Sequence, residues 1–168
     1  YGIFRRNTGV DPGRRPGVLL VHGLDEPGGI WADLVPALGA AGFDTWEFFY
    51  PNDQGIDISA DLLAASWSDI PVDQRLVLVG HSMGGLVIRD FVSRWRHPVA
   101  VPPRVTGASV QGVILAGTPN QGSDWARLRV WLELRDQWAA GRQSGFSPLG
   151  GLRDGTGAAK IDLVPGSG

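Results

Sequence analysis

The chain has 168 residues, of which 43% are hydrophobic and 19% charged, and its formal net charge is −2. This composition is typical of one soluble globular domain and excludes a disordered chain. The 15 basic and 17 acidic side chains leave no charge excess that would draw the protein to nucleic acid or to an anionic membrane surface. No apolar run approaches the roughly 20 residues that a membrane-spanning helix needs. The sequence has no cysteine, which excludes disulfides and cysteine-ligated metals.

Short β-branched runs alternate along the chain with longer segments of helical period, a pattern typical of βαβ units around a parallel sheet. Four buried strands are expected, in chain order, at residues 18–21, 45–50, 76–79 and 110–116. Three helices are expected between them, the first from about residue 31 to residue 42, the second over 58–68 and the third over 86–95. The predicted fold class is therefore α/β, with a mainly parallel sheet and flanking helices.

The chain shows no repeat and no interdomain linker, so residues 1–168 are interpreted as a single domain. Residues 124–160 are expected to form a lid, because residues 125–138 have a helical period and a glycine-rich stretch follows them. The apolar side chains of this segment either cover the main core or line a substrate pocket. Tyr1 is not an initiator methionine, so we expect the chain to begin at a processing boundary. No targeting segment is visible, which leaves the compartment open.

The strongest chemical signal follows the third predicted strand. Gly80-His81-Ser82-Met83-Gly84 is a G-x-S-x-G pentapeptide with a buried strand before it and an amphipathic helix after it. A strand that turns into a helix within about one residue exposes the serine hydroxyl at the strand's carboxyl end, and side chains at positions 80 and 84 would collide there. We therefore predict that Ser82 is a nucleophile. The Met83 N–H would lie at the helix N-terminus, where an oxyanion can be stabilised.

A second signal follows the first predicted strand, where an apolar run leads directly into His22-Gly23-Leu24. Acyl transfer needs an oxyanion donor besides the N–H that follows the nucleophile, and this donor comes from the loop after an adjacent strand. The Leu24 N–H is the candidate for this second donor. His22 and Gly23 are expected to support the loop, as Gly80, His81 and Gly84 support the serine turn.

These residues resemble the α/β-hydrolase fold, and in particular bacterial lipases and esterases. Residues 113–123 are similar to the GTPHxGS stretch of such lipases, although Asn120 stands where histidine is usual, and residues 162–167 are similar to the DLxPGS segment that closes their lid region. The resemblance implies a serine hydrolase that cleaves small-molecule carboxylic esters through an acyl-enzyme and needs no cofactor. Residues with the spacing of a metal site or a P-loop do not occur in the sequence.

The triad partners of the serine are not recognisable in the sequence. The resemblance implies the chain order serine, acid, histidine, with the last two on loops after two further strands. His97 lies fifteen residues after Ser82 along a helix, roughly 22 Å away, and the side chain of His81 diverges from Ser82 in such a turn. His22 is the histidine that could approach the site, yet it is assigned to the oxyanion loop. No acid is assigned either, so we expect the triad histidine and acid, and the remaining strands, beyond residue 168.

An alternative class of function stays open at this point. Without its own base, the domain could be a non-catalytic module of the same fold that binds an acyl ligand or a partner chain. If the chain ended at residue 168, the strand at 113–116 would be an apolar sheet edge and would favour self-association. Thioesterases, amidases and acyltransferases share the same serine turn, so the enzyme hypothesis leaves the acyl chemistry open as well.

Overall fold

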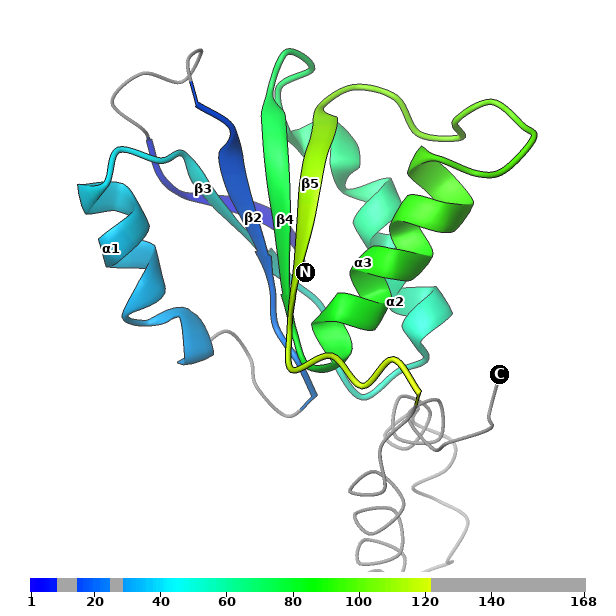
Figure 1. Ribbon diagram of the computed structural model, residues 1–168, viewed down its shortest axis with the longest axis horizontal. Coiled ribbons are helices and arrows are strands. Elements are labelled where there is room, and N and C mark those ends of the chain that lie inside the picture. The colour runs from blue at the N-terminus through cyan, green and yellow to red at the C-terminus, as the bar shows by residue number, and fades with distance from the viewer. Residues whose placement is uncertain (9–14, 25–28, 122–168) are drawn as a thin grey trace, which may run out of the picture. The chain divides into compact units, whose positions relative to one another are not determined.

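The computed structural model describes residues 1–8, 15–24 and 29–121. All described helices and strands belong to one compact unit, residues 1–52 and 56–118, whereas residues 53–55 and 119–121 belong to a second unit. In the first unit a five-stranded sheet of order β1-β3-β2-β4-β5 has α1 on one face and α2 and α3 on the other (Figure 1). None of the helices in these ranges has the length and apolar character required to cross a membrane. The predicted lid, residues 124–160, lies outside the described residues.

The four strands predicted from the sequence are confirmed as mutually parallel strands. They are β2 (Gly17–Val21), β3 (Thr45–Phe49), β4 (Arg75–His81) and β5 (Ser109–Ala116). A further strand, β1 (Gly2–Asn7), was not predicted, and it pairs antiparallel with β3 at the edge of the sheet. The middle of β1 is exposed and contains Arg5 and Arg6, so it lacks the apolar run that marks a buried strand.

The three predicted helices are also confirmed, and each has one end that is wound differently from an α-helix. A 3₁₀ turn precedes the first helix and another follows the second, while the third continues into a π-helical turn. In chain order the elements are η1 (Gly29–Trp31), α1 (Leu34–Ala40), α2 (Ile56–Ala65), η2 (Trp67–Asp69), α3 (Met83–Phe91) and η3 (Val92–Arg96). The helical periodicity therefore predicted where each helix lies, whereas the local winding at its ends depends on neighbouring elements.

The core is built on both faces of β2, whose five residues are all buried. Val18 and Leu20 pack together with Trp31 in a cluster that includes side chains of α1. Leu19, which points to the opposite face, is fully buried on the side of the sheet that α2 and α3 cover (Figure 1). This double burial explains why β2 reads as a continuous apolar run in the sequence.

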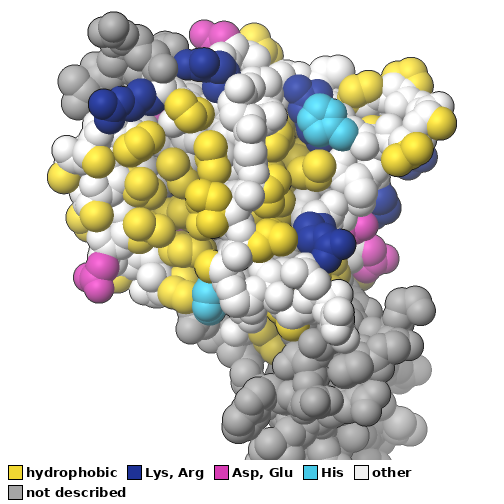
Figure 2. Space-filling model, viewed as in Figure 1, with side chains coloured by type: hydrophobic (Ala, Val, Ile, Leu, Met, Phe, Trp, Pro, Cys, Tyr) yellow, Lys and Arg dark blue, Asp and Glu magenta, His cyan; other side chains and the backbone are white. Residues whose placement is uncertain are grey.

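The expectation of a buried strand is wrong for β5. In the described part of the chain β5 pairs with β4 alone, and Val113, Ile114 and Leu115 are 40%, 55% and 38% exposed. Hydrophobic side chains gather on the face of the molecule that carries this edge (Figure 2). The apolar, β-branched composition of residues 110–116 correctly indicated a strand, but composition does not report how many neighbours a strand has.

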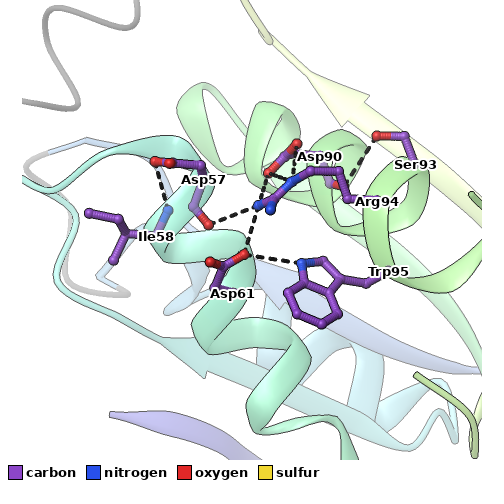
Figure 3. A network of polar contacts seen from close by, with 7 residues as sticks. All are labelled: Asp57, Ile58, Asp61, Asp90, Ser93, Arg94 and Trp95. Atoms are coloured by element: carbon purple, nitrogen blue, oxygen red, sulfur yellow. Dashed lines mark hydrogen bonds and ion pairs between the residues drawn. The ribbon is translucent and has the colours of Figure 1, made fainter. Parts of the chain in front are cut away.

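A network of polar contacts links α2 to the end of α3 and to η3 (Figure 3). It is here called the α2–α3 clamp and consists of Asp57, Asp61, Asp90, Arg94 and Trp95. Arg94 Nη2 lies 2.8 Å from an Asp61 carboxylate oxygen and Arg94 Nε lies 2.8 Å from both Asp90 oxygens. The Trp95 indole N–H donates to Asp61 at 3.1 Å, and Arg94 also donates to the Asp57 carbonyl at 3.0 Å. Hydrogen bonding to Asp90 raises the pKa of the Arg94 guanidinium, so the clamp keeps its positive charge.

Candidate active site

Ser82 occupies the turn between β4 and α3, and its backbone is strained. Its φ of 52° and ψ of −125° lie in a region that residues other than glycine rarely adopt. Such a conformation costs on the order of 1–3 kcal/mol and persists where the surroundings enforce it. Here the Ser82 N–H donates to the Ala116 carbonyl at 2.8 Å, and the Gly85 N–H donates to the Ser82 carbonyl at 3.1 Å. Backbone contacts on both sides therefore hold the serine in place.

The glycines before and after the serine are required by close backbone approach. A Cβ on Gly80 would lie 2.5 Å from the Gly85 Cα and 2.6 Å from the Gly85 nitrogen. A Cβ on Gly84 would overlap the carbonyl oxygens of Val21 and His22 at the end of β2. Helix α3 can thus start directly above β2 and β4 only because neither position carries a side chain, as the sequence pattern predicted.

The loop after β2 contacts the serine directly. A Cβ on Gly23 would lie 2.9 Å from the Ser82 Cβ and 3.4 Å from the Ser82 Oγ, so the Gly23 backbone passes against the hydroxyl-bearing side chain. The two segments meet because β2 and β4 are parallel neighbours whose carboxyl ends lie at one edge of the sheet. Leu24 follows Gly23 and is half-buried. Met83 is the first residue of α3, so its N–H has no acceptor within the helix.

Residues that follow β3 donate hydrogen bonds to the loop after β2. The Tyr50 hydroxyl donates to the His22 carbonyl at 2.6 Å, and the Asn52 side-chain N–H donates to the Gly23 carbonyl at 3.0 Å. His22 Nδ1 lies 3.0 Å from the Gly23 carbonyl as well, and its ring stacks on Tyr50 with centroids 4.4 Å apart. His22 is buried, with 1% of its surface exposed. His22 therefore contacts both the loop and Tyr50.

The other two histidines lie where the sequence placed them. His81 packs edge-on against Trp31, with ring centroids 6.4 Å apart and planes at 85°. His97 is exposed and follows η3, at the end of the long helical segment that starts after Ser82. Among the acids, Asp90 belongs to the α2–α3 clamp. Within residues 1–8, 15–24 and 29–121, no group of three or more His, Asp or Glu side chains could hold a metal ion.

Sequence reasoning missed three residues around the serine. Tyr50 and Asn52 support the loop after β2, and Thr118 packs against Gly85 at the start of α3. A signal for the first two was present, because Tyr50-Pro51-Asn52 directly follows a strand whose carboxyl end lies beside that of β2. The contact of Thr118 depends on the register between β4 and β5, which no local pattern encodes.

No protein-family model and no curated protein matches the sequence. Solved structures do match, among them the mature form of the lipase BlEst2 of Bacillus licheniformis, at 22% identity over 98% of this chain and 61% of that chain with a TM-score of 0.68. An esterase of Thermogutta terrifontis matches at 20% identity over 96% of this chain and 66% of that chain, with a TM-score of 0.58. YbtT, a type II thioesterase of the yersiniabactin pathway, matches at 17% identity over 98% and 70%, with a TM-score of 0.59.

The chain therefore has the α/β-hydrolase fold, as the serine turn and the loop after β2 indicated. It spans 61% of the length of the Bacillus lipase. The matching proteins include lipases, esterases and a thioesterase, all of which are similar to this chain in fold.

Proposed function

We propose that the protein is a serine hydrolase of the lipase and esterase type, which cleaves carboxylic esters through an acyl-enzyme on Ser82. The observation that carries the proposal is the strained Ser82 backbone, with φ at 52°, held against the Gly23 backbone of the neighbouring loop. Strained backbone that its surroundings enforce is concentrated at active sites, and a partly exposed serine between a buried strand and a helix N-terminus is the geometry of a nucleophile.

In the proposed reaction Ser82 Oγ attacks the carbonyl carbon of the ester, and its proton passes to a histidine supplied from outside residues 1–168. The carbonyl oxygen becomes an oxyanion that accepts hydrogen bonds from the Leu24 and Met83 N–H groups. The C–O bond to the alcohol then breaks, and the alcohol leaves with the proton held by the histidine. Water, deprotonated by the same histidine, attacks the acyl-enzyme, which releases the carboxylic acid and restores the Ser82 hydroxyl.

The proposed substrates are esters of medium or longer acyl chains, because the sequence of residues 125–138 has apolar side chains at helical spacing, the pattern from which we expect a lid. A thioester presents the same carbonyl to the serine, so the proposal is sharpened by a comparison of matched substrates. We expect kcat/KM to be higher for p-nitrophenyl octanoate than for p-nitrophenyl acetate. We also expect kcat/KM for p-nitrophenyl octanoate to exceed that for an octanoyl thioester. A preference for the acetate would contradict a long acyl chain while leaving the serine mechanism intact.

The test of the mechanism is covalent labelling of the full-length protein with an alkyl fluorophosphonate, followed by mass spectrometry of the peptide that contains Ser82. We expect one adduct, on Ser82, and a loss of ester hydrolysis by a factor of about 10³ or more in Ser82→Ala. Ser93→Ala is the matched control, because Ser93 lies in η3 and its hydroxyl donates a hydrogen bond to the Asp90 carbonyl. A folded, full-length protein that takes up no label on Ser82 would exclude the proposed function.

The exposed edge of β5 favours a second candidate, a non-catalytic module that associates through this edge with another copy of the chain. Val113, Ile114 and Leu115 are apolar and exposed, and among the described residues β5 has β4 as its single partner strand. In this case the 168-residue chain self-associates in light scattering, and Ile114→Lys reduces the association. A monodisperse monomer would argue against the module and leave the hydrolase as the single candidate.

A further inference from the structure

We infer that Tyr50 and Asn52 are positioning residues, which orient the peptide bond between Gly23 and Leu24 so that the Leu24 N–H faces the oxyanion. The inference rests on the proposed function and adds to it a source of the loop's rigidity. Both residues follow β3, which β2 separates from β4, the strand before the serine turn.

The peptide geometry gives the main argument. In a trans peptide unit the carbonyl of one residue and the N–H of the next point in opposite directions. The Gly23 carbonyl and the Leu24 N–H belong to one such unit. Asn52 donates to the Gly23 carbonyl at 3.0 Å, and His22 Nδ1, which must carry its hydrogen to bond a carbonyl, lies at 3.0 Å from the same oxygen. Two donors on the carbonyl thus fix the direction of the N–H on the other side of the unit.

Tyr50 fixes the preceding peptide unit. Its hydroxyl donates to the His22 carbonyl at 2.6 Å, and its ring is held between Phe48 and His22 with centroid distances of 5.0 Å and 4.4 Å. Tyr50 is 3% exposed, and burial raises the pKa of its hydroxyl, so the donor keeps its proton at any working pH. Consecutive peptide units on either side of Gly23 are therefore bonded from one side of the loop.

The loop needs this support because residue 23 is glycine. A side chain there would meet Ser82, so the position is restricted to the residue with the greatest backbone freedom. A free Gly23 could rotate its peptide and turn the Leu24 N–H away from the site. The hydrogen bonds from Tyr50 and Asn52 restrict this rotation of the Gly23 peptide before the substrate binds. Oxyanion stabilisation requires such preorganised donors.

The experiment compares Asn52→Asp, Asn52→Ala and Tyr50→Phe with wild type in the full-length protein, using p-nitrophenyl octanoate. Removing a direct oxyanion donor costs about 10²- to 10³-fold in kcat, so removing its support is expected to cost less. We expect kcat to fall about 10-fold in both Asn52 variants and about 5-fold in Tyr50→Phe, which keeps the ring stacking, with KM within about twofold. Asn7→Asp is the matched control, because the Asn7 side-chain N–H bonds the Val35 carbonyl at 3.1 Å away from the site.

A second readout separates positioning from a merely structural role. A trifluoromethyl ketone forms an anionic hemiketal with the serine, so its affinity should fall by the same factor as kcat/KM in each variant, with the melting temperature near that of wild type. If wild type hydrolyses the ester and the Asn52 and Tyr50 variants keep kcat and ketone affinity within twofold, the inference is wrong and the proposed function stands. The inference is equally wrong if kcat falls only in proportion to a loss of folded protein. If wild-type Ser82 takes up no fluorophosphonate, the proposed function and this inference both fail.

Discussion

Strands β2 and β5 flank β4 on opposite sides, and both contribute to the position of Ser82. The loop after β2 passes against the serine side chain, and the last residue of β5, Ala116, accepts the serine N–H. Yet every residue of β2 is buried, whereas three consecutive apolar side chains of β5 are exposed. The backbones of both neighbouring strands therefore position Ser82. Of these two strands, β2 is fully buried and β5 is not.

The first prediction compares the loss of stability when one apolar side chain is shortened on β2 and one on β5. Leu20→Ala on β2 removes a side chain with 0% exposure and leaves a cavity, which is expected to lower the free energy of unfolding by about 3 kcal/mol. Ile114→Ala on β5 removes a side chain that is 55% exposed and is expected to cost less than about 1 kcal/mol. Urea unfolding followed by tryptophan fluorescence measures both. Equal losses would mean that β5 is as well packed as β2 in solution.

The second prediction uses glycines of the two regions. Gly84→Ala places a Cβ against the carbonyl oxygens of Val21 and His22, so we expect a loss of about 2 kcal/mol and a loss of fluorophosphonate labelling. Gly112→Ala on β5 is the matched control, because no described residue lies within 4 Å of its added Cβ, and it should change stability by less than about 0.5 kcal/mol. Normal labelling of a folded Gly84→Ala protein would show that α3 can shift without moving Ser82.

The same contrast explains how far the sequence predicts the molecule. The serine turn and β2 were predictable because their causes are local, namely glycines at fixed offsets and an apolar run that is buried on both faces. The exposure of β5 was not, because an edge strand and a central strand can have the same composition. The roles of Tyr50 and Asn52 depend on the strand order, which brings the end of β3 beside the end of β2. The position of β1 depends on contacts with residues distant in sequence, among them the ion pairs of Arg5 with Asp44 and of Arg6 with Glu47.

The third prediction concerns the α2–α3 clamp, which links α2 to the end of α3 and to η3 beside the buried apolar side chains of both helices. The clamp is partly exposed, with the Arg94 and Asp61 side chains 36% and 52% accessible, so its ion pairs are worth little individually. Arg94→Gln is expected to lower the free energy of unfolding by about 1 kcal/mol, and 1 M NaCl should reduce this difference. Arg104→Gln, at an exposed arginine in the loop before β5, is the control and should have no measurable effect. A difference that does not respond to salt would assign the loss to packing of the Arg94 stem.

The last prediction concerns Glu47 of β3, the strand that pairs with β2 on the side away from β4. This side chain is 3% exposed beside Arg6, and burial raises the pKa of its carboxyl above 4.5, with Arg6 lowering it by less. A pKa that is raised in the folded state means that the stabilisation is complete below 4.5 and is lost as pH rises through the folded value. Glu47 should therefore become less favourable to folding as the pH rises from 4 to 7.

Glu47→Gln tests this sign, because glutamine has nearly the same shape and no charge. We expect the variant and wild type to have similar free energies of unfolding at pH 4, and the variant to gain on wild type towards pH 7, by about 1.4 kcal/mol for each unit by which the pKa is raised. Asp73→Asn, at an exposed position before β4, is the control for replacing a carboxylate by its amide. If Glu47→Gln instead loses stability relative to wild type as the pH rises, the ion pair with Arg6 outweighs desolvation. An ion pair would then stabilise β3, the neighbour of β2, in addition to apolar packing. Burial of apolar side chains alone would not explain why the sheet is more stable at β2 than at β5.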